Sequence, residues 1–116
     1  MESWDLLAID APDGTRDPVV LRTTNDARAV LVRIDAGQAL GEHQVKEAAW
    51  ILVVDGVVRV RSGERELEAG AGTLFRFEPD ERRAIASAGG ARILLLLSPW
   101  PGAGHFRGQE KAATRR

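Results

Sequence analysis

Residues 37–56 read Gly37-Gln-Ala-Leu-Gly-Glu-His43-Gln-Val-Lys-Glu-Ala-Ala-Trp50-Ile-Leu-Val-Val-Asp-Gly56, and this stretch decides the fold. It opens as a glycine-bounded loop through His43 and becomes an apolar run that ends at Asp55-Gly56. A second β-like run follows at residues 57–61. A two-residue Asp-Gly between such runs is the strongest short hairpin signal. The stretch therefore predicts a β-hairpin centred on Asp55-Gly56.

Short β-like runs continue on both sides of this stretch. They comprise residues 19–21, 29–34, 65–68, 73–77, 83–86 and 93–97. Turns containing Gly, Asn, Asp or Pro separate them, and none carries a sustained helical stripe. Short strands at regular spacing are typical of a β-sandwich or β-barrel. We therefore predict an all-β fold.

Composition excludes several classes of protein. The 116 residues form one domain of ordinary size, with 44% apolar and 28% charged residues. A net charge of -1 gives no basic excess for nucleic acid. The chain has no cysteine, and no apolar segment has the length of a membrane span. Residues 1–10 lack the basic leader of a secretory signal, so the expected location is the cytosol.

The order of glycines, strands and proline resembles the cupin superfamily across about residues 29–97. In the first cupin motif, Gly37, His43 and Gly56 fall on the family spacing, whereas Val45 and Ala49 replace a histidine and the glutamate. The second motif places a glycine, a proline, a turn and a last histidine. Here Gly72 and Pro79 match, Asp80 replaces the turn glycine, and Arg83 occupies the histidine position. The resemblance implies a double-stranded β-helix, or jelly-roll barrel.

The same resemblance makes the usual cupin metal site degenerate. Typical cupins hold a divalent metal with three histidines and a glutamate, and only His43 keeps a suitable donor. Arg83 is always cationic and has no lone pair to donate. We therefore expect no metal cofactor. A weak alternative is a triad of His43, Glu47 and His105 around a divalent metal.

Six residues are candidates for a ligand site. His43 is either a pocket base or a histidine held by hydrogen bonds at the barrel mouth. Arg83 is either an anchor for a carboxylate or phosphate, or an arginine at the barrel rim that is paired with Glu81 or Glu47 or solvated beside Arg82. Gln44 and Glu47 are either pocket groups or solvated loop residues. Phe75 shares a face with Phe77 and forms either a pocket wall or core. His105 either folds back to the mouth or lies in an exposed tail.

Three hypotheses of function follow. The first is a protein that binds a small anionic or partly apolar molecule in the barrel without metal. The second is a metal-independent isomerase, epimerase or lyase with His43 as the general base and Arg83 stabilising an oxyanion. The third is a structural or regulatory homodimer, with Trp50 or an N-terminal strand containing Trp4 and Leu6 at its interface.

The chain is expected to divide into three parts. Residues 1–28 form an N-terminal arm with short strands, residues 29–98 form the cupin barrel core, and residues 99–116 form a Pro/Gly-rich and then charged tail. The expected partners are a small molecule and a second copy of the chain, with no nucleic acid and no membrane.

Overall fold

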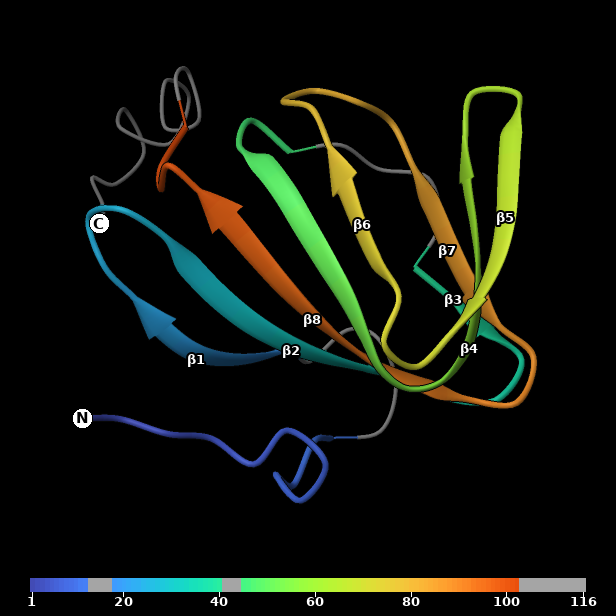
Figure 1. Cartoon of the computed structure of the whole chain (residues 1–116), viewed down its shortest axis with the longest axis horizontal. Coiled ribbons are helices and arrows are strands. Elements are labelled where there is room, and N and C mark those ends of the chain that lie inside the picture. The colour runs from blue at the N-terminus through green and yellow to red at the C-terminus, as the bar shows by residue number, and fades with distance from the viewer. Residues whose placement is uncertain (13–17, 41–44, 103–116) are drawn as a thin grey trace.

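The computed structural model describes residues 1–12, 18–40 and 45–102 (Figure 1). Within these residues the regular structure is entirely β, as predicted. The strands are β1 (Val19–Thr23), β2 (Arg28–Ile34), β3 (Gln38–Ala39), β4 (Ala48–Ser62), β5 (Arg65–Gly70), β6 (Leu74–Phe77), β7 (Ala84–Ser87) and β8 (Ala91–Ser98). The described part of the chain contains no helix that could cross a membrane.

The strands form two antiparallel sheets that share β4. In the first sheet β1 pairs β2, β2 pairs β8, β8 pairs the first part of β4, and β4 pairs β6. In the second sheet the last part of β4 pairs both β5 and β7, and β7 pairs β3. The sheets curl around a common interior (Figure 1). This is the jelly-roll arrangement that the sequence predicts.

The hairpin predicted at Asp55-Gly56 is wrong. Strand β4 runs without reversal through both residues. A type I′ turn requires positive φ at two successive residues, but only Gly56, at 82°, has it here. The register against β8 shifts between Val53 and Asp55, which is a β-bulge. A bulge bends a strand, so β4 leaves the first sheet and enters the second. The actual hairpin follows β4, where Ser62 pairs with Arg65.

Buried and exposed side chains alternate along the strands, and the buried ones form the core. In β4, Ala49, Ile51 and Val53 are buried before the bulge, and Val58 and Val60 are buried after it. The leucine run of residues 93–97 is β8, a strand as predicted, and it pairs β2 and β4 on its two sides. Side chains from both sheets meet in one apolar cluster. The sequence pattern thus dictated which residues fill the barrel.

The N-terminal arm differs from the expectation of an interface strand. Residues 1–12 form no strand, and a turn brings the amides of Ala8 and Ile9 to the carbonyl of Asp5. Arg92 Nη1 donates hydrogen bonds to the carbonyls of Leu6 and Ile9, at 2.9 and 2.7 Å. Arg33 donates to the carbonyl of Ala11. These bonds hold the arm against the first sheet.

Candidate functional site

Arg83 is the largest fully buried side chain among the described residues, with 1% of its surface exposed. It directly precedes β7, and its side chain has the same inward parity as Ile85 and Ser87. The expectation of a rim arginine, solvated or ion-paired, is therefore wrong. Its Nε and Nη1 atoms have no hydrogen-bond partner among the described residues. A buried cation of this kind is costly unless an anion or acceptor reaches it.

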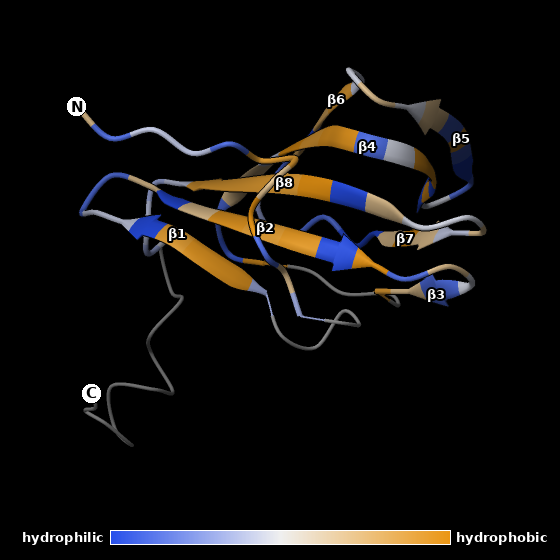
Figure 2. Ribbon diagram, turned by 90° about the horizontal axis from the view of Figure 1, so that it is seen from below, coloured by the Kyte–Doolittle hydropathy of each residue, from blue (hydrophilic) through white to orange (hydrophobic). Residues whose placement is uncertain are grey.

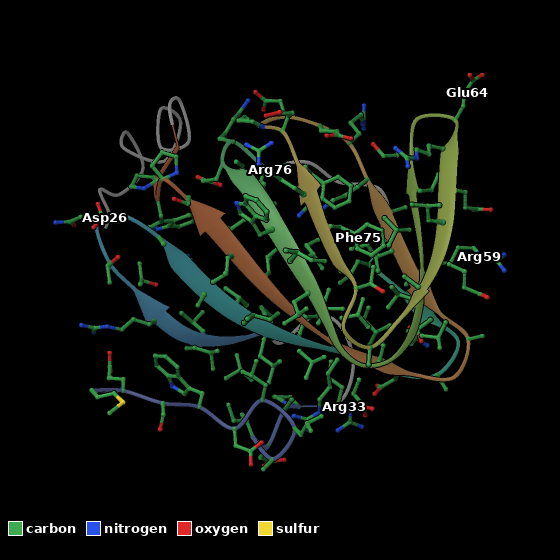
Figure 3. All side chains as sticks on the ribbon, viewed as in Figure 1. Asp26, Arg33, Arg59, Glu64, Phe75 and Arg76 are labelled. Atoms are coloured by element: carbon green, nitrogen blue, oxygen red, sulfur yellow. The ribbon has the colours of Figure 1, made fainter. Side chains whose placement is uncertain are left out.

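An aromatic pair lies beside this cation. The guanidinium carbon of Arg83 is 5.2 Å from the centroid of the Phe77 ring. Phe77 stacks on Phe75 with ring centroids 6.4 Å apart, and it pairs across the strands with Ala49. Figure 3 shows Phe75 and Arg76 on opposite sides of β6. The predicted shared face of Phe75 and Phe77 is confirmed.

A hollow of about 340 Å³ opens between β5 and β6. Its apolar wall comes from Val60, Leu67, Phe75 and Phe77, and its polar residues include Arg65, Arg76 and Glu81. This volume lies within the usual range for small-molecule sites. Phe77, which lies beside the Arg83 guanidinium, is one of the residues that line this hollow.

Glu81 is the acidic residue whose charge acts on Arg83. Its Oε2 accepts a hydrogen bond from the Ser62 hydroxyl at 2.6 Å, and its Oε1 accepts one from the amide of Glu78 at 2.9 Å. The Ser62 bond is the largest cause that lowers the pKa of Glu81. Burial lowers the pKa of Arg83, and the charge of Glu81 acts in the opposite direction. Arg83 nevertheless stays protonated at neutral pH, because a guanidinium loses its proton only in strong alkali.

Replacing Glu81 by glutamine should remove a pH-dependent part of the stability. Since the folded protein holds the pKa of Glu81 below its ordinary value of 4.5, the carboxylate stabilises the fold above that pH. The stabilisation disappears as the pH falls through the lowered pKa. After solvent screening we expect a difference on the order of 0.5 kcal/mol between wild type and Glu81→Gln. Urea unfolding at about pH 7 and about pH 3 measures it. An equal difference at both pH values would contradict the role of the charge.

Glu47 is fully buried, so the alternative of a solvated loop glutamate is wrong. Its Oε2 accepts a hydrogen bond of 2.8 Å from the amide of Gly102. That bond fastens the chain after β8 to the start of β4. A Cβ on Gly102 would lie 2.5 Å from the carbonyl oxygen of Lys46, so only glycine permits this approach. Glu47 thus has a clear structural role.

The described residues do not fit the divalent metal of typical cupins. Val45 packs against the core, Ala49 is fully buried, and Arg83 brings a positive charge to the position of the last histidine. No group of three or more possible metal ligands occurs within residues 1–12, 18–40 and 45–102. First-row metals require several N, O or S donors that converge on one point.

Three of the predicted site residues, His43, Gln44 and His105, lie outside the described residues. The catalytic role of His43 and the triad of His43, Glu47 and His105 therefore stay predictions. The structure brings both Arg83 and Phe75 into contact with the Phe77 ring, and it places Glu47 in the contact with Gly102. Sequence spacing did not indicate the contact of Ser62 with Glu81, because the two residues come from different strands and turns.

Comparisons with known proteins agree with this architecture. A profile described as the AraC-like ligand binding domain matches residues 28–97. No curated protein sequence matches the chain.

Solved structures share the fold at low sequence identity. An RmlC-like cupin protein from Desulfovibrio desulfuricans superposes with a TM-score of 0.75 at 19% identity, over 85% of this chain and 97% of that one. A double-stranded β-helix protein from Klebsiella pneumoniae gives 0.75 at 16%, over 89% and 94%. KdgF from Halomonas sp. gives 0.68 at 22%, over 78% and 85%. The chain belongs to the family of AraC-like ligand-binding domains, and it has the fold of the solved cupin structures.

Proposed function

We propose that the protein binds a small molecule with an anionic group and a partly apolar body inside the barrel, without the metal of typical cupins. The buried, positively charged side chain of Arg83 carries this proposal, because two of its nitrogens lack acceptors among the described residues. A carboxylate of the ligand would supply these acceptors. The planar guanidinium matches a carboxylate through two parallel hydrogen bonds.

The surroundings of Arg83 support an anion that carries an apolar body. Phe77 covers one side of the guanidinium, and Phe75 continues the aromatic surface into the hollow. Glu81, whose charge acts on Arg83, has both carboxylate oxygens engaged by Ser62 and Glu78. Because this carboxylate is held elsewhere, it neutralises Arg83 only at a distance. An incoming anion would therefore gain most of the attraction of the buried charge.

Matched acids and amides test the proposal. We expect protein that has been dialysed against EDTA to bind benzoate and hexanoate more tightly than benzamide and hexanamide, by about tenfold to a hundredfold. The reason is that hydrogen bonds to a charged group contribute about 1.5–3 kcal/mol. Isothermal titration calorimetry measures the four affinities. In Arg83→Met the preference for the acids should disappear.

Arg59→Met is the matched control. Arg59 lies on an exposed part of β4 and pairs with Glu68 on the neighbouring strand, so its loss should leave the acid preference unchanged. Equal affinity of wild type for acids and amides would refute the anion anchor. So would an unchanged acid preference in Arg83→Met.

A further inference from the structure

The charged residues of β5 are sorted by sign between its two faces. Leu67 pairs across the strands with the buried Val60, so Leu67 and, two residues before it, Arg65 face the barrel interior. Glu66 and Glu68 alternate with them and therefore lie on the outer face. Figure 2 shows the hydrophilic colouring of much of this strand. The inner face of β5 thus carries a cation, and the outer face carries the acids.

The outer acids of β5 are matched by arginines of β4 on the same face. Glu68 forms an ion pair of 3.6 Å with Arg59, and Glu66 is directly opposite Arg61. Figure 3 shows Arg59 on the outer side of the β4–β5 hairpin. Arg65, on the inner face, has no ion-pair partner among the described residues. Its charge is thus available to a molecule in the hollow, which Arg65 lines.

Arg65 and the buried Arg83 lie on the two sides of one residue, Ser62. Ser62 is directly opposite Arg65 in the pairing of β4 with β5. On the other side of β4, the Ser62 hydroxyl oxygen lies 3.0 Å from the carbonyl oxygen of Arg82, and the pairing with β7 reaches the residue after Arg83. Ser62 and Arg65 line the hollow, and Arg83 has the inward parity of β7. Because neighbouring strands are about 4.8 Å apart, about 10 Å separates the backbones of the two arginines.

The other charged groups that line the hollow already have partners. Both carboxylate oxygens of Glu81 accept hydrogen bonds, and Arg76 Nη1 lies 2.9 Å from Glu78 Oε2. Val60 and Leu67 form an apolar wall two residues along the strands from Ser62 and Arg65. The hollow therefore suits a short apolar chain that carries an anionic group at each end.

We propose that the ligand is a dicarboxylic acid, with one carboxylate at Arg83 and the second at Arg65. This inference rests on the proposed function, since Arg65 is a second anchor for a molecule that Arg83 already holds. Arg65 is then the residue that distinguishes diacids from monoacids. Its contribution is smaller than that of Arg83, because Arg65 is exposed and solvent screens its charge.

Adipate and monomethyl adipate test this assignment, because they differ in the charge of the second end and share the same chain. We expect protein that has been dialysed against EDTA to bind adipate about threefold to tenfold more tightly, beyond the statistical advantage of two identical ends. Isothermal titration calorimetry measures both affinities. In Arg65→Met this gain should disappear, whereas the preference for hexanoate over hexanamide, which depends on Arg83, should remain.

Arg59→Met is again the matched control, because Arg59 belongs to the same hairpin but lies on its outer face. It should keep both the diacid gain and the acid preference, and circular dichroism melting reports whether each variant is folded. Equal affinity of wild type for adipate and its monoester, with hexanoate still preferred over hexanamide, would overturn the second anchor alone. Loss of the hexanoate preference in wild type would instead refute the anchor at Arg83 and the proposed function with it. A diacid gain that survives in folded Arg65→Met, or that disappears in Arg59→Met, would also overturn the role of Arg65.

Discussion

Replacing Gly56 by alanine should lower the free energy of unfolding by about 2–5 kcal/mol. Two effects add at this position. A residue with a side chain loses about 1–2 kcal/mol when it is held at positive φ, and Gly56 has a φ of 82°. A Cβ would also lie 2.2 Å from the carbonyl oxygen of Gly90 and 2.9 Å from the Cα of Ala91. Such overpacking against backbone costs about a further 1–3 kcal/mol.

Two other glycines separate these effects. Gly63 and Gly72 also have positive φ, at 61° and 93°, but nothing lies within 4 Å of the Cβ positions. Alanine at either should therefore cost only about 1–2 kcal/mol. Urea unfolding of the three variants and wild type gives the comparison. A loss at Gly56 no larger than at Gly63 would show that the approach of β4 to Gly90, just before β8, is not tight.

Replacing Arg83 by methionine should raise the free energy of unfolding of the ligand-free protein by about 2 kcal/mol. Methionine fills a similar apolar space and adapts its shape. It also removes a buried cation whose Nε and Nη1 have no hydrogen-bond partner among the described residues. Exchanging buried ionic groups for apolar side chains is often neutral or stabilising by about 1–4 kcal/mol. The variant should thus be more stable and lose the preference for acids.

Arg83→Lys is the control for this effect. Lysine keeps a charge that must be desolvated, so this variant should gain no stability. Thermal and urea unfolding without added ligand measure all three proteins. A marked loss of stability in Arg83→Met would show that the guanidinium supports the fold rather than a ligand. This combination of greater stability and lost binding is characteristic of a residue retained for function.

Much of the fold was predictable because it rests on local pattern. The β-branched run of residues 29–34 and the leucine run of residues 93–97 became the neighbouring strands β2 and β8. The Asp-Gly prediction failed because one residue with positive φ serves a bulge as well as a turn. The bulge lies in the pairing of β4 with β8, two strands far apart in sequence, so local pattern does not distinguish it from a turn.

The turn after β6 shows how a sequence departure is absorbed. Asp80 stands where cupins place a glycine, and it keeps the glycine conformation with a φ of 66°. Its amide donates to the carbonyl of Val45, and its carboxylate pairs with Lys46. Aspartate tolerates this conformation better than most residues. The second cupin motif was recognisable here because Asp80 keeps the positive φ that the turn requires, although its side chain differs from that of glycine.

The site was less predictable than the fold. Arg83 and Glu47 are charged residues, so pattern alone favours a solvated position for both. Their burial depends on long-range contacts, with Phe77 and the strand interior for Arg83 and with Gly102 for Glu47. Sequence could identify which family positions had changed. It could not say that the guanidinium of Arg83 would be enclosed in the barrel.

The sharing of β4 has a consequence for how the protein unfolds. Its 15 residues pair with β5, β6, β7 and β8. Because β4 belongs to both sheets, unfolding of one sheet removes a strand from the other. Neither sheet can melt as a separate cooperative unit. The same arrangement ties most native contacts to partners distant in sequence, which is the condition for slow, all-or-none folding. The arm, held mainly by a few arginine contacts to its carbonyls, is the segment that can open without breaking the barrel.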